Sequence, residues 1–157
     1  MLFLRMADVH TVEIRSYNMS RIKSKNTKPE ILVRGFLHKA GYRFRLHKKD
    51  LPGKPDIVLP KHKAVVLVHG CFWHGHKSCK YYRLPKTRTD WWELKVKNNI
   101  LRDKKNSAEL EKAGWKLITI WECELKPKVR QVTLENLLSQ LVDNAEIKAD
   151  QDKTKNG

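Results

Sequence analysis

Residues 51–69 read LPGKPDIVLPKHKAVVLVH, and this stretch sets the fold. Within it the runs 56–59 and 64–69 are largely apolar, and a short link that begins with proline separates them. Two such runs joined by a short link predict an antiparallel hairpin. If residues 56 and 69 face each other, the chain turns inside the link and Asp56 lies beside His69. The sequence therefore predicts an acid next to a histidine at the open end of the hairpin.

Periodic hydrophobic residues outside the hairpin predict the remaining elements. Thr27 and Glu30 have the spacing of a capping box at a helix start, and Asp90 and Glu93 repeat that spacing. Gly41 fits the left-handed residue that commonly ends a helix. The predicted elements are helices over 16–25, 27–41, 90–114 and 133–142, and strands over 42–46 and 115–121.

The order of these elements predicts an α/β fold in which helices flank a mixed β-sheet. The 157 residues are near the usual size of one domain, and the sequence contains no internal repeat or Gly/Ser linker. We expect an irregular arm over 1–15, one domain over 16–145 and a polar, disordered tail over 146–157. The apolar start of the chain is too short for a signal-peptide core, and Met6 is an alternative initiator.

The chain is strongly basic, with 33 Lys plus Arg against 17 Asp plus Glu and a formal charge of +16. This surplus predicts a polyanionic partner, most often nucleic acid. No apolar run approaches the roughly 20 residues that cross a bilayer, which excludes an integral membrane protein. Three cysteines cannot form a disulfide framework, so we expect a protein of the reducing cytoplasm.

Two cysteines and two histidines lie close together within residues 71–79, and Cys123 follows a predicted strand. Thiolate and imidazole groups are the ligands of tetrahedral zinc, so the cluster predicts a structural Zn²⁺ site with no open position. Spacing alone leaves the choice between His74 and His76 nearly even. Our chosen ligands are Cys71, His76, Cys79 and Cys123. That choice leaves His74 free for catalysis.

Asp56 follows Gly-x-Pro at a strand start, next to the hairpin. Mg²⁺ needs only one or two carboxylates, with backbone oxygen, water and substrate phosphate as its other ligands. Asp56 therefore predicts a hard-cation site, and the alternative is a turn acid that stabilises the Pro-Gly loop. Chemistry alone assigns Glu30 to its helix cap and Asp103 to a solvated helix face.

Exposed aromatic side chains on a basic surface can stack on bases or wedge into a duplex step. Phe72 and Trp73 lie between proposed zinc ligands, and Trp91 and Trp92 open a predicted helix after a basic loop. We expect one tryptophan of the second pair, Trp91, to belong to the core. The predicted DNA-contacting residues are Phe72, Trp73, Trp92, Lys86 and Arg88.

Four short strings carry a family resemblance: LPGKPD at 51–56, HGCFWHGH at 69–76, TRT at 87–89 and WEC at 121–123. Together they resemble the very-short-patch repair (Vsr) DNA mismatch endonucleases. The string MADVH from Met6 is similar to the family's opening and favours Met6 as the natural start. The resemblance covers roughly residues 6–123.

The resemblance implies a restriction-endonuclease-like fold, related to the PD-(D/E)xK nucleases. 

It implies an enzyme that nicks one strand 5′ of the thymine at T:G mismatches, which arise when 5-methylcytosine deaminates. The implied partner is double-stranded DNA with such a mismatch. The family further implies a functional association with a DNA cytosine-5 methyltransferase, an association with mismatch-repair proteins, and a monomer.

The resemblance also implies roles for individual residues. It makes Asp56 the Mg²⁺ ligand, together with the backbone carbonyl of Val68. It makes His69 and His74 the catalytic histidines, with Asp103 orienting one of them and Glu30 supporting the site. It assigns Zn²⁺ to the four residues already chosen. The implied wedge beside the mismatch consists of Phe72, Trp73 and Trp92.

One departure from the wider nuclease pattern affects the chemistry. That pattern expects an acid-x-Lys on the second hairpin strand, whereas residues 66–68 read Val-Leu-Val, so histidine must replace the lysine. Two alternatives stay open. One is another nuclease of the same fold, such as a restriction enzyme or junction resolvase, and the other is a zinc-stabilised DNA-binding module without catalysis.

Overall fold

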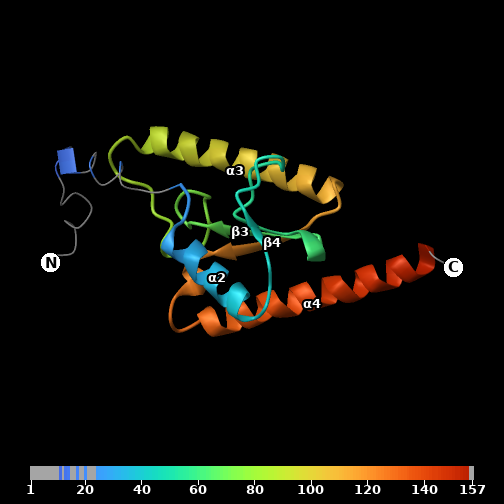
Figure 1. The fold of residues 1–157 in the computed structure, drawn as a ribbon. Helices are drawn as coiled ribbons and strands as arrows, with labels where there is room; N and C mark the ends of the chain where they lie inside the picture. Colours follow the sequence, from blue (N-terminus) through green and yellow to red (C-terminus); the bar gives the residue numbers. More distant parts are fainter. Residues whose placement is uncertain (1–10, 12, 15–16, 18–19, 21–23, 156–157) are drawn as a thin grey trace.

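A four-stranded sheet forms the centre of the computed structural model, which describes residues 11, 13–14, 17, 20 and 24–155, with side chains up to 142. The strand order is β1-β2-β3-β4, and only the β3–β4 pair is parallel. Helix α3 lies along one side of the sheet, whereas α2 and α4 lie along the other (Figure 1). The strands are β1 (Arg45–Leu46), β2 (Ile57–Leu59), β3 (Ala64–His69) and β4 (Lys116–Trp121). The predicted mixed α/β architecture is therefore confirmed.

The predicted hairpin forms, but its register differs by two residues from the prediction. Ile57 faces Val66, and Leu59 faces Ala64. The link folds as a short 3-10 turn, η1 (Pro60–His62), followed by Lys63 with φ 51°. The observed pairing is symmetric about the link over 60–63, so the predicted pairing of residues 56 and 69 placed the centre of the hairpin one residue too late.

Helix α2 (Lys28–Lys39) begins and ends as predicted from its capping residues. The Thr27 Oγ1 accepts from the Glu30 backbone N–H, and the Glu30 side chain accepts from the Asn26 backbone N–H. Gly41 adopts φ 89°, so the chain leaves the helix through a left-handed residue that only glycine adopts without strain.

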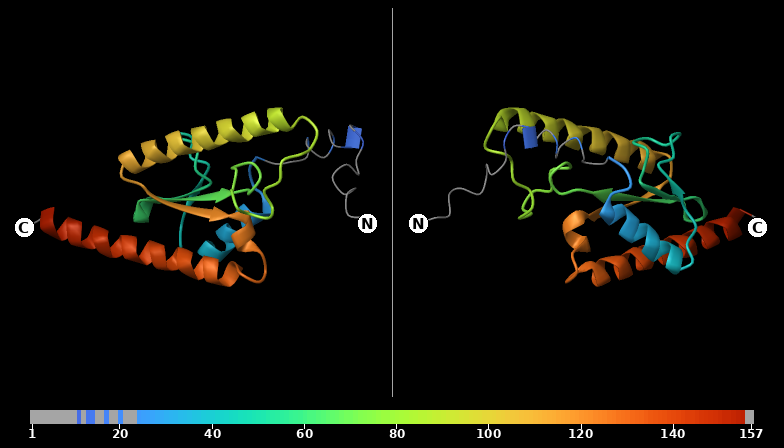
Figure 2. Two further views of the ribbon diagram at one scale, coloured as in Figure 1. Left: turned by 180° about the vertical axis from the view of Figure 1, so that it is seen from behind. Right: turned by 60° about the vertical axis from the view of Figure 1, so that its left-hand side comes forward.

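Two other helix boundaries differ from the predictions. Helix α3 (Thr89–Lys112) follows Arg88, which has φ 55° and no side-chain cap, so the predicted Asp90–Glu93 capping box is wrong. Helix α4 (Arg130–Lys155) is longer than the predicted 133–142 and continues through most of the expected tail. Its C-terminal end extends beyond the sheet in each view (Figure 2).

The predicted strand over 42–46 shortens to β1, because Tyr42 and Phe44 pack against the core outside the ladder. The expected arm over 1–15 and helix over 16–25 lie largely outside the described residues.

The core has two parts, one on each face of the sheet. The larger part joins α2 and α4 to the sheet through side chains such as Leu37, Ile57 and Leu141, all fully buried. The smaller part packs Leu110 of α3 against Val58 and Val65. Because both faces are covered, the ends of β2 and β3 are held rigidly where the candidate site lies. Among the described helices, none combines the length and apolar character needed to span a bilayer.

Candidate active site and metal cluster

An open cavity of about 1240 Å³ lies between the start of α2, the hairpin and α3. Its walls come from segments that are far apart in the sequence, including the 51–56 turn and the end of β3. The five residues predicted to be catalytic all line it: Glu30, Asp56, His69, His74 and Asp103.

Asp56 is half-buried at the start of β2 and is anchored by the neighbouring strand. Its Oδ2 accepts a hydrogen bond of 2.8 Å from the Val68 backbone N–H. The predicted proximity of Asp56 to Val68 is thus confirmed despite the different register. Burial raises the pKa of Asp56 to about 6, against the opposing effect of that hydrogen bond. A carboxylate that is poorly solvated and still faces a cavity is well suited to a divalent cation.

His69 and His74 stack with parallel rings whose centroids are 3.8 Å apart. The Nδ1 of His74 lies 2.6 Å from Oδ2 of Asp103 on α3. Because an ionised carboxylate can only accept, this contact places the proton on Nδ1 and leaves Nε2 as the acceptor. Burial, together with the neighbouring His74, lowers the pKa of His69 to about 4. The pair therefore contains one neutral imidazole and one that a carboxylate orients.

Glu30 combines a capping position with a place in the cavity wall. It caps α2, as described above, and it is the buried charged residue of the described chain, with 2% of its surface exposed. Its charge is one of the effects that raise the pKa of Asp56. Arg34, one turn further along α2, donates to Glu30 Oε2 at 2.8 Å and offsets this buried charge.

His47 is a candidate site residue that the sequence analysis missed. Its side chain, with that of Glu30 and that of Asp56, forms a three-residue group whose potential ligand atoms all lie within 4.8 Å of one another. The β1–β2 ladder pairs Leu46 with Ile57, so His47 follows β1 directly opposite Asp56. The pairing of β1 with β2 is the signal that would have placed His47 beside Asp56. A strand of two residues is too short for this pairing to be predicted from the sequence.

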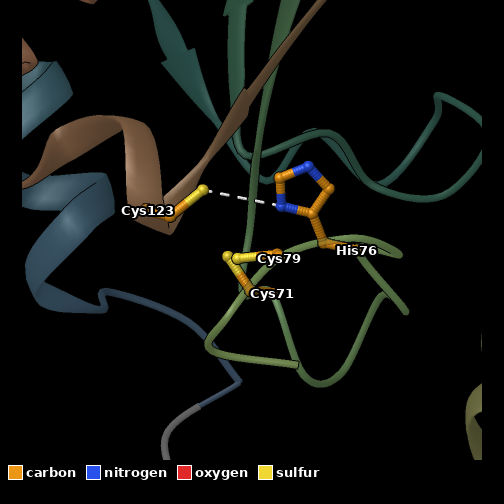
Figure 3. Close-up of side chains that lie close together, drawn as sticks. All are labelled: Cys71, His76, Cys79 and Cys123. Atoms are coloured by element: carbon orange, nitrogen blue, oxygen red, sulfur yellow. Dashed lines mark hydrogen bonds between the residues drawn. The ribbon is translucent and has the colours of Figure 1, made fainter. Parts of the chain in front are cut away.

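The four side chains chosen as zinc ligands come together beside the cavity. Figure 3 shows the sulfur atoms and the imidazole ring turned toward one another from the loop after β3 and from η2 (Glu122–Leu125). Cys123 Sγ lies 3.5 Å from His76 Nδ1, and all four potential ligand atoms are within 4.8 Å of one another. Bound Zn²⁺ with Zn–S bonds of about 2.3 Å requires spacings of about 3.8 Å, so small rotations would suffice.

The three neighbouring thiols differ in the direction of their pKa shifts. Burial raises the pKa of Cys71, and burial with the two neighbouring thiols raises the pKa of Cys123 to about 12. The pKa of Cys79 is lowered because the Tyr81 backbone N–H stabilises its thiolate. Three thiols this close cannot all ionise without a positive charge between them, a charge that Zn²⁺ would supply.

Gly75 lies between His74, which faces the cavity, and His76, which belongs to the cysteine cluster. It adopts φ 62°, and a Cβ built on it would lie 2.5 Å from Ile100 Cδ1 of α3. Asn99 of the same helix donates to the Trp73 carbonyl at 3.0 Å. The loop is therefore pressed against α3, which carries Asp103.

The aromatic residues of this region form a connected group. Phe72, Trp73 and Trp92 contact one another with ring centroids 5.1 to 5.9 Å apart. The expectation that Trp91 belongs to the core is wrong, because 42% of its surface is exposed. The first turn of α3 turns Trp92 toward the loop and Trp91 outward. Arg88 lies over the Trp91 ring at 4.9 Å, and Lys86 is exposed on the preceding loop.

Comparisons with known proteins point to one family. A family model described as DNA mismatch endonuclease Vsr matches residues 7–80. The type II nicking enzyme V.NmeAIP of Neisseria meningitidis is 50% identical over 139 residues, which are 88% of this chain and 99% of that protein. V.XorIIP of Xanthomonas oryzae, also a type II nicking enzyme, is 52% identical over 120 residues, 76% of this chain and 88% of the relative.

A third relative carries the family's own name. The DNA mismatch endonuclease Vsr of Escherichia coli is 38% identical over 136 residues, which are 87% of this chain and 86% of that protein. These relatives are nucleases by name. The chain belongs to the Vsr DNA mismatch endonuclease family.

Proposed function

We propose that this DNA mismatch endonuclease nicks one strand of double-stranded DNA 5′ of the thymine at a T:G mismatch. The family membership supports mismatch cleavage, and the names of two relatives support a nick in place of a double-strand break. The observation that carries the chemistry is the shared cavity of Asp56, the stacked histidines and Asp103.

His74 is the general base of the proposed reaction. Asp103 fixes the proton on Nδ1, so Nε2 is free to accept a proton from the attacking water. Asp103 then stabilises the resulting imidazolium, as a carboxylate does in other acid–histidine pairs. The neutral His69 stacks against His74 and adds no competing charge. The products are a 5′-phosphate and a 3′-hydroxyl.

Asp56 holds the catalytic cation in this proposal, with the backbone carbonyl of Val68 as a second protein ligand. The fit rests on a carboxylate that is desolvated, anchored through one oxygen and open to the cavity. Mg²⁺ bound there would supply positive charge at the scissile phosphate and at the leaving oxygen. The general base and the cation ligand thus come from different walls of one cavity.

Zn²⁺ has a structural role in this proposal. Its ligands Cys71, His76, Cys79 and Cys123 connect the loop after β3 to the segment after β4. A closed four-ligand site leaves no position for a reactive water. Its task is to fix the loop that carries His74 and the aromatic residues.

Phe72, Trp73 and Trp92 form the proposed wedge, and Lys86 and Arg88 contact phosphates. The three rings already support one another, so inserting them between bases requires little further ordering. A mismatched step costs less to unstack than a paired step, so the wedge itself favours mismatches. The substrate arises from deaminated 5-methylcytosine, so we also propose a cytosine-5 methyltransferase and mismatch-repair proteins as functional partners.

A nicking assay tests the proposal. End-labelled duplexes that differ only in a T:G or a T:A pair are incubated with zinc-loaded protein and Mg²⁺. We expect a nick 5′ of the mismatched thymine and a loss of at least about a thousandfold in rate for Asp56→Asn. Asp50→Asn is the matched control, because Asp50 is exposed and pairs only with Lys48 in the described chain.

Equal cutting of both duplexes would contradict the mismatch proposal and favour another nuclease of this fold. Salt-sensitive binding without Mg²⁺-dependent cleavage would contradict the catalytic proposal and favour a DNA-binding module.

A further inference from the structure

Arg34 places a permanent positive charge behind the proposed cation site. Its Nη2 atom lies 2.8 Å from Glu30 Oε2 and 3.1 Å from His47 Nε2. Its Nη1 atom donates to Asn26 Oδ1 at 2.8 Å. The guanidinium therefore bridges two of the three side chains that could hold a metal ion with Asp56.

The group that Arg34 bridges has a donor set with a definite metal preference. Two carboxylates and one imidazole favour first-row transition metals, whose affinity rises toward Ni²⁺ and Cu²⁺. Mg²⁺ prefers oxygen ligands and retains several waters. If the nitrogen of His47 and the oxygens of Glu30 and Asp56 were all free, the site would therefore bind transition metals tightly.

We propose that Arg34 determines the metal specificity of this site by keeping the His47 nitrogen and a Glu30 oxygen out of the coordination sphere. The guanidinium engages the lone pair of His47 Nε2 and Oε2 of Glu30, and the Thr27 hydroxyl donates to Glu30 Oε1, so Asp56 is left as the available donor of the group. A site with one carboxylate, a backbone carbonyl and water suits Mg²⁺ and binds Ni²⁺ or Zn²⁺ weakly. This inference rests on the proposed cation site at Asp56.

The bridge is fixed by its surroundings. Glu30 and His47 have 3% and 15% of their side-chain surface exposed, so solvent competes little for these contacts. The Arg34 Nε atom is buried without a hydrogen-bond partner in the described chain. The polar contacts described above for Arg34 come from its two terminal nitrogens. A planar, always charged guanidinium is suited to such a bridge, whereas an ammonium is a single point charge.

Titration calorimetry on tag-free, zinc-loaded protein tests this inference without using activity. Ni²⁺ and Mg²⁺ are titrated into the wild type, Arg34→Met, His47→Gln and the double variant. We expect Arg34→Met to bind Ni²⁺ at least tenfold more tightly at one additional site, with Mg²⁺ affinity changed less than threefold. The double variant loses this gain, and His47→Gln alone leaves Ni²⁺ binding unchanged. Arg43→Met, which removes an exposed arginine bonded to the Tyr42 carbonyl, is the control.

Two outcomes would overturn the inference. One is an Arg34→Met protein that binds Ni²⁺ no more tightly than the wild type. The other is a tenfold loss of Ni²⁺ or Mg²⁺ affinity in His47→Gln, which would make His47 a ligand in the wild type. If Arg34→Met fails to fold because Glu30 is left unpaired, Arg34→Lys replaces it in the titration. We expect a smaller gain in Ni²⁺ affinity from Arg34→Lys, and no gain at all would overturn the inference. Failure of the proposed function is separate, since it appears as Mg²⁺ binding that Asp56→Asn does not weaken.

Discussion

His74 and His76 lie on one loop but belong to two different clusters. Comparing them distinguishes the proposed structural metal site from the proposed catalytic site. His76 joins three cysteines in a compact group whose potential ligand atoms lie within 4.8 Å of one another. His74 faces an open cavity with Asp103. Gly75 between them allows the chain to turn one side chain each way. In the proposed function, the cysteine cluster holds the loop and the His74–Asp103 pair is reached by a phosphate.

Removal of Zn²⁺ should have the largest effect. Chelation removes a contribution on the order of 10 kcal/mol to the folded state, so we expect the loop over 70–88 to unfold with much of the domain. Circular dichroism with metal analysis measures this. Asp56→Asn is the comparison, and it should retain both its zinc and its fold. A chelated protein with an unchanged melting curve would show that the cysteine cluster does not support the loop.

Asp103→Asn should reduce catalysis without disturbing the zinc cluster. The amide no longer fixes the His74 tautomer or stabilises its charged form, so we expect single-turnover nicking to slow by about 10²- to 10⁴-fold. Bound zinc and the melting temperature should change little. Asp90→Asn, an exposed acid of the same helix, serves as the control. A rate within threefold of the wild type would exclude Asp103 from the mechanism.

Gly75→Ala should weaken the connection between the two clusters. The new Cβ would overlap Ile100 in a residue that already has positive φ, so we expect a loss of about 2–3 kcal/mol in the free energy of unfolding. Gly35→Ala is the matched control, because nothing lies within 4 Å of its Cβ position inside α2, and it should stabilise slightly. Denaturant unfolding measures both. Equal effects of the two substitutions would contradict the proposed packing.

The ionisation of Asp56 should give the smallest effect, seen in Mg²⁺-free buffer. Its pKa is about 6 in the folded protein against 3.8 as a model value, so the folded state binds the proton more tightly. Its contribution to stability is therefore lost as pH rises from about 4 through 6. Asp56→Asn removes this dependence, and we expect it to be about 2 kcal/mol more stable than the wild type at pH 8 but not at pH 4. Thermal melts at both pH values measure this, and a variant less stable at pH 8 would contradict it.

The sequence predicted those parts of the site that local chemistry determines. Three of the four cluster side chains lie within one short loop and the fourth follows a strand, and this spacing of cysteine and histidine predicted that they come together. The hairpin followed from two β-type runs and a short link, although the predicted pairing of residues 56 and 69 was two residues out of register. Asp56 and Val68 still met, because a side chain can reach across a shift of this size.

The residues that the sequence analysis missed depend on tertiary contacts. His47 enters the site through the pairing of a strand only two residues long. Trp91 and Trp92 are adjacent and chemically identical, so only the start of α3 decides which one faces the loop. Glu30 and Asp103 were assigned a site role by family resemblance, because a capping acid and a helix-surface acid give no catalytic signal by themselves.

The cysteine cluster also constrains the order of events during synthesis. Cys71, His76 and Cys79 leave the ribosome long before Cys123, which follows the last strand. The nascent chain therefore carries two unpaired thiols and lacks the fourth donor until β4 has emerged and paired with β3. We expect metal uptake to be a late step that locks an already assembled sheet, and thiol oxidation before that step to divert newly made protein from its mature state.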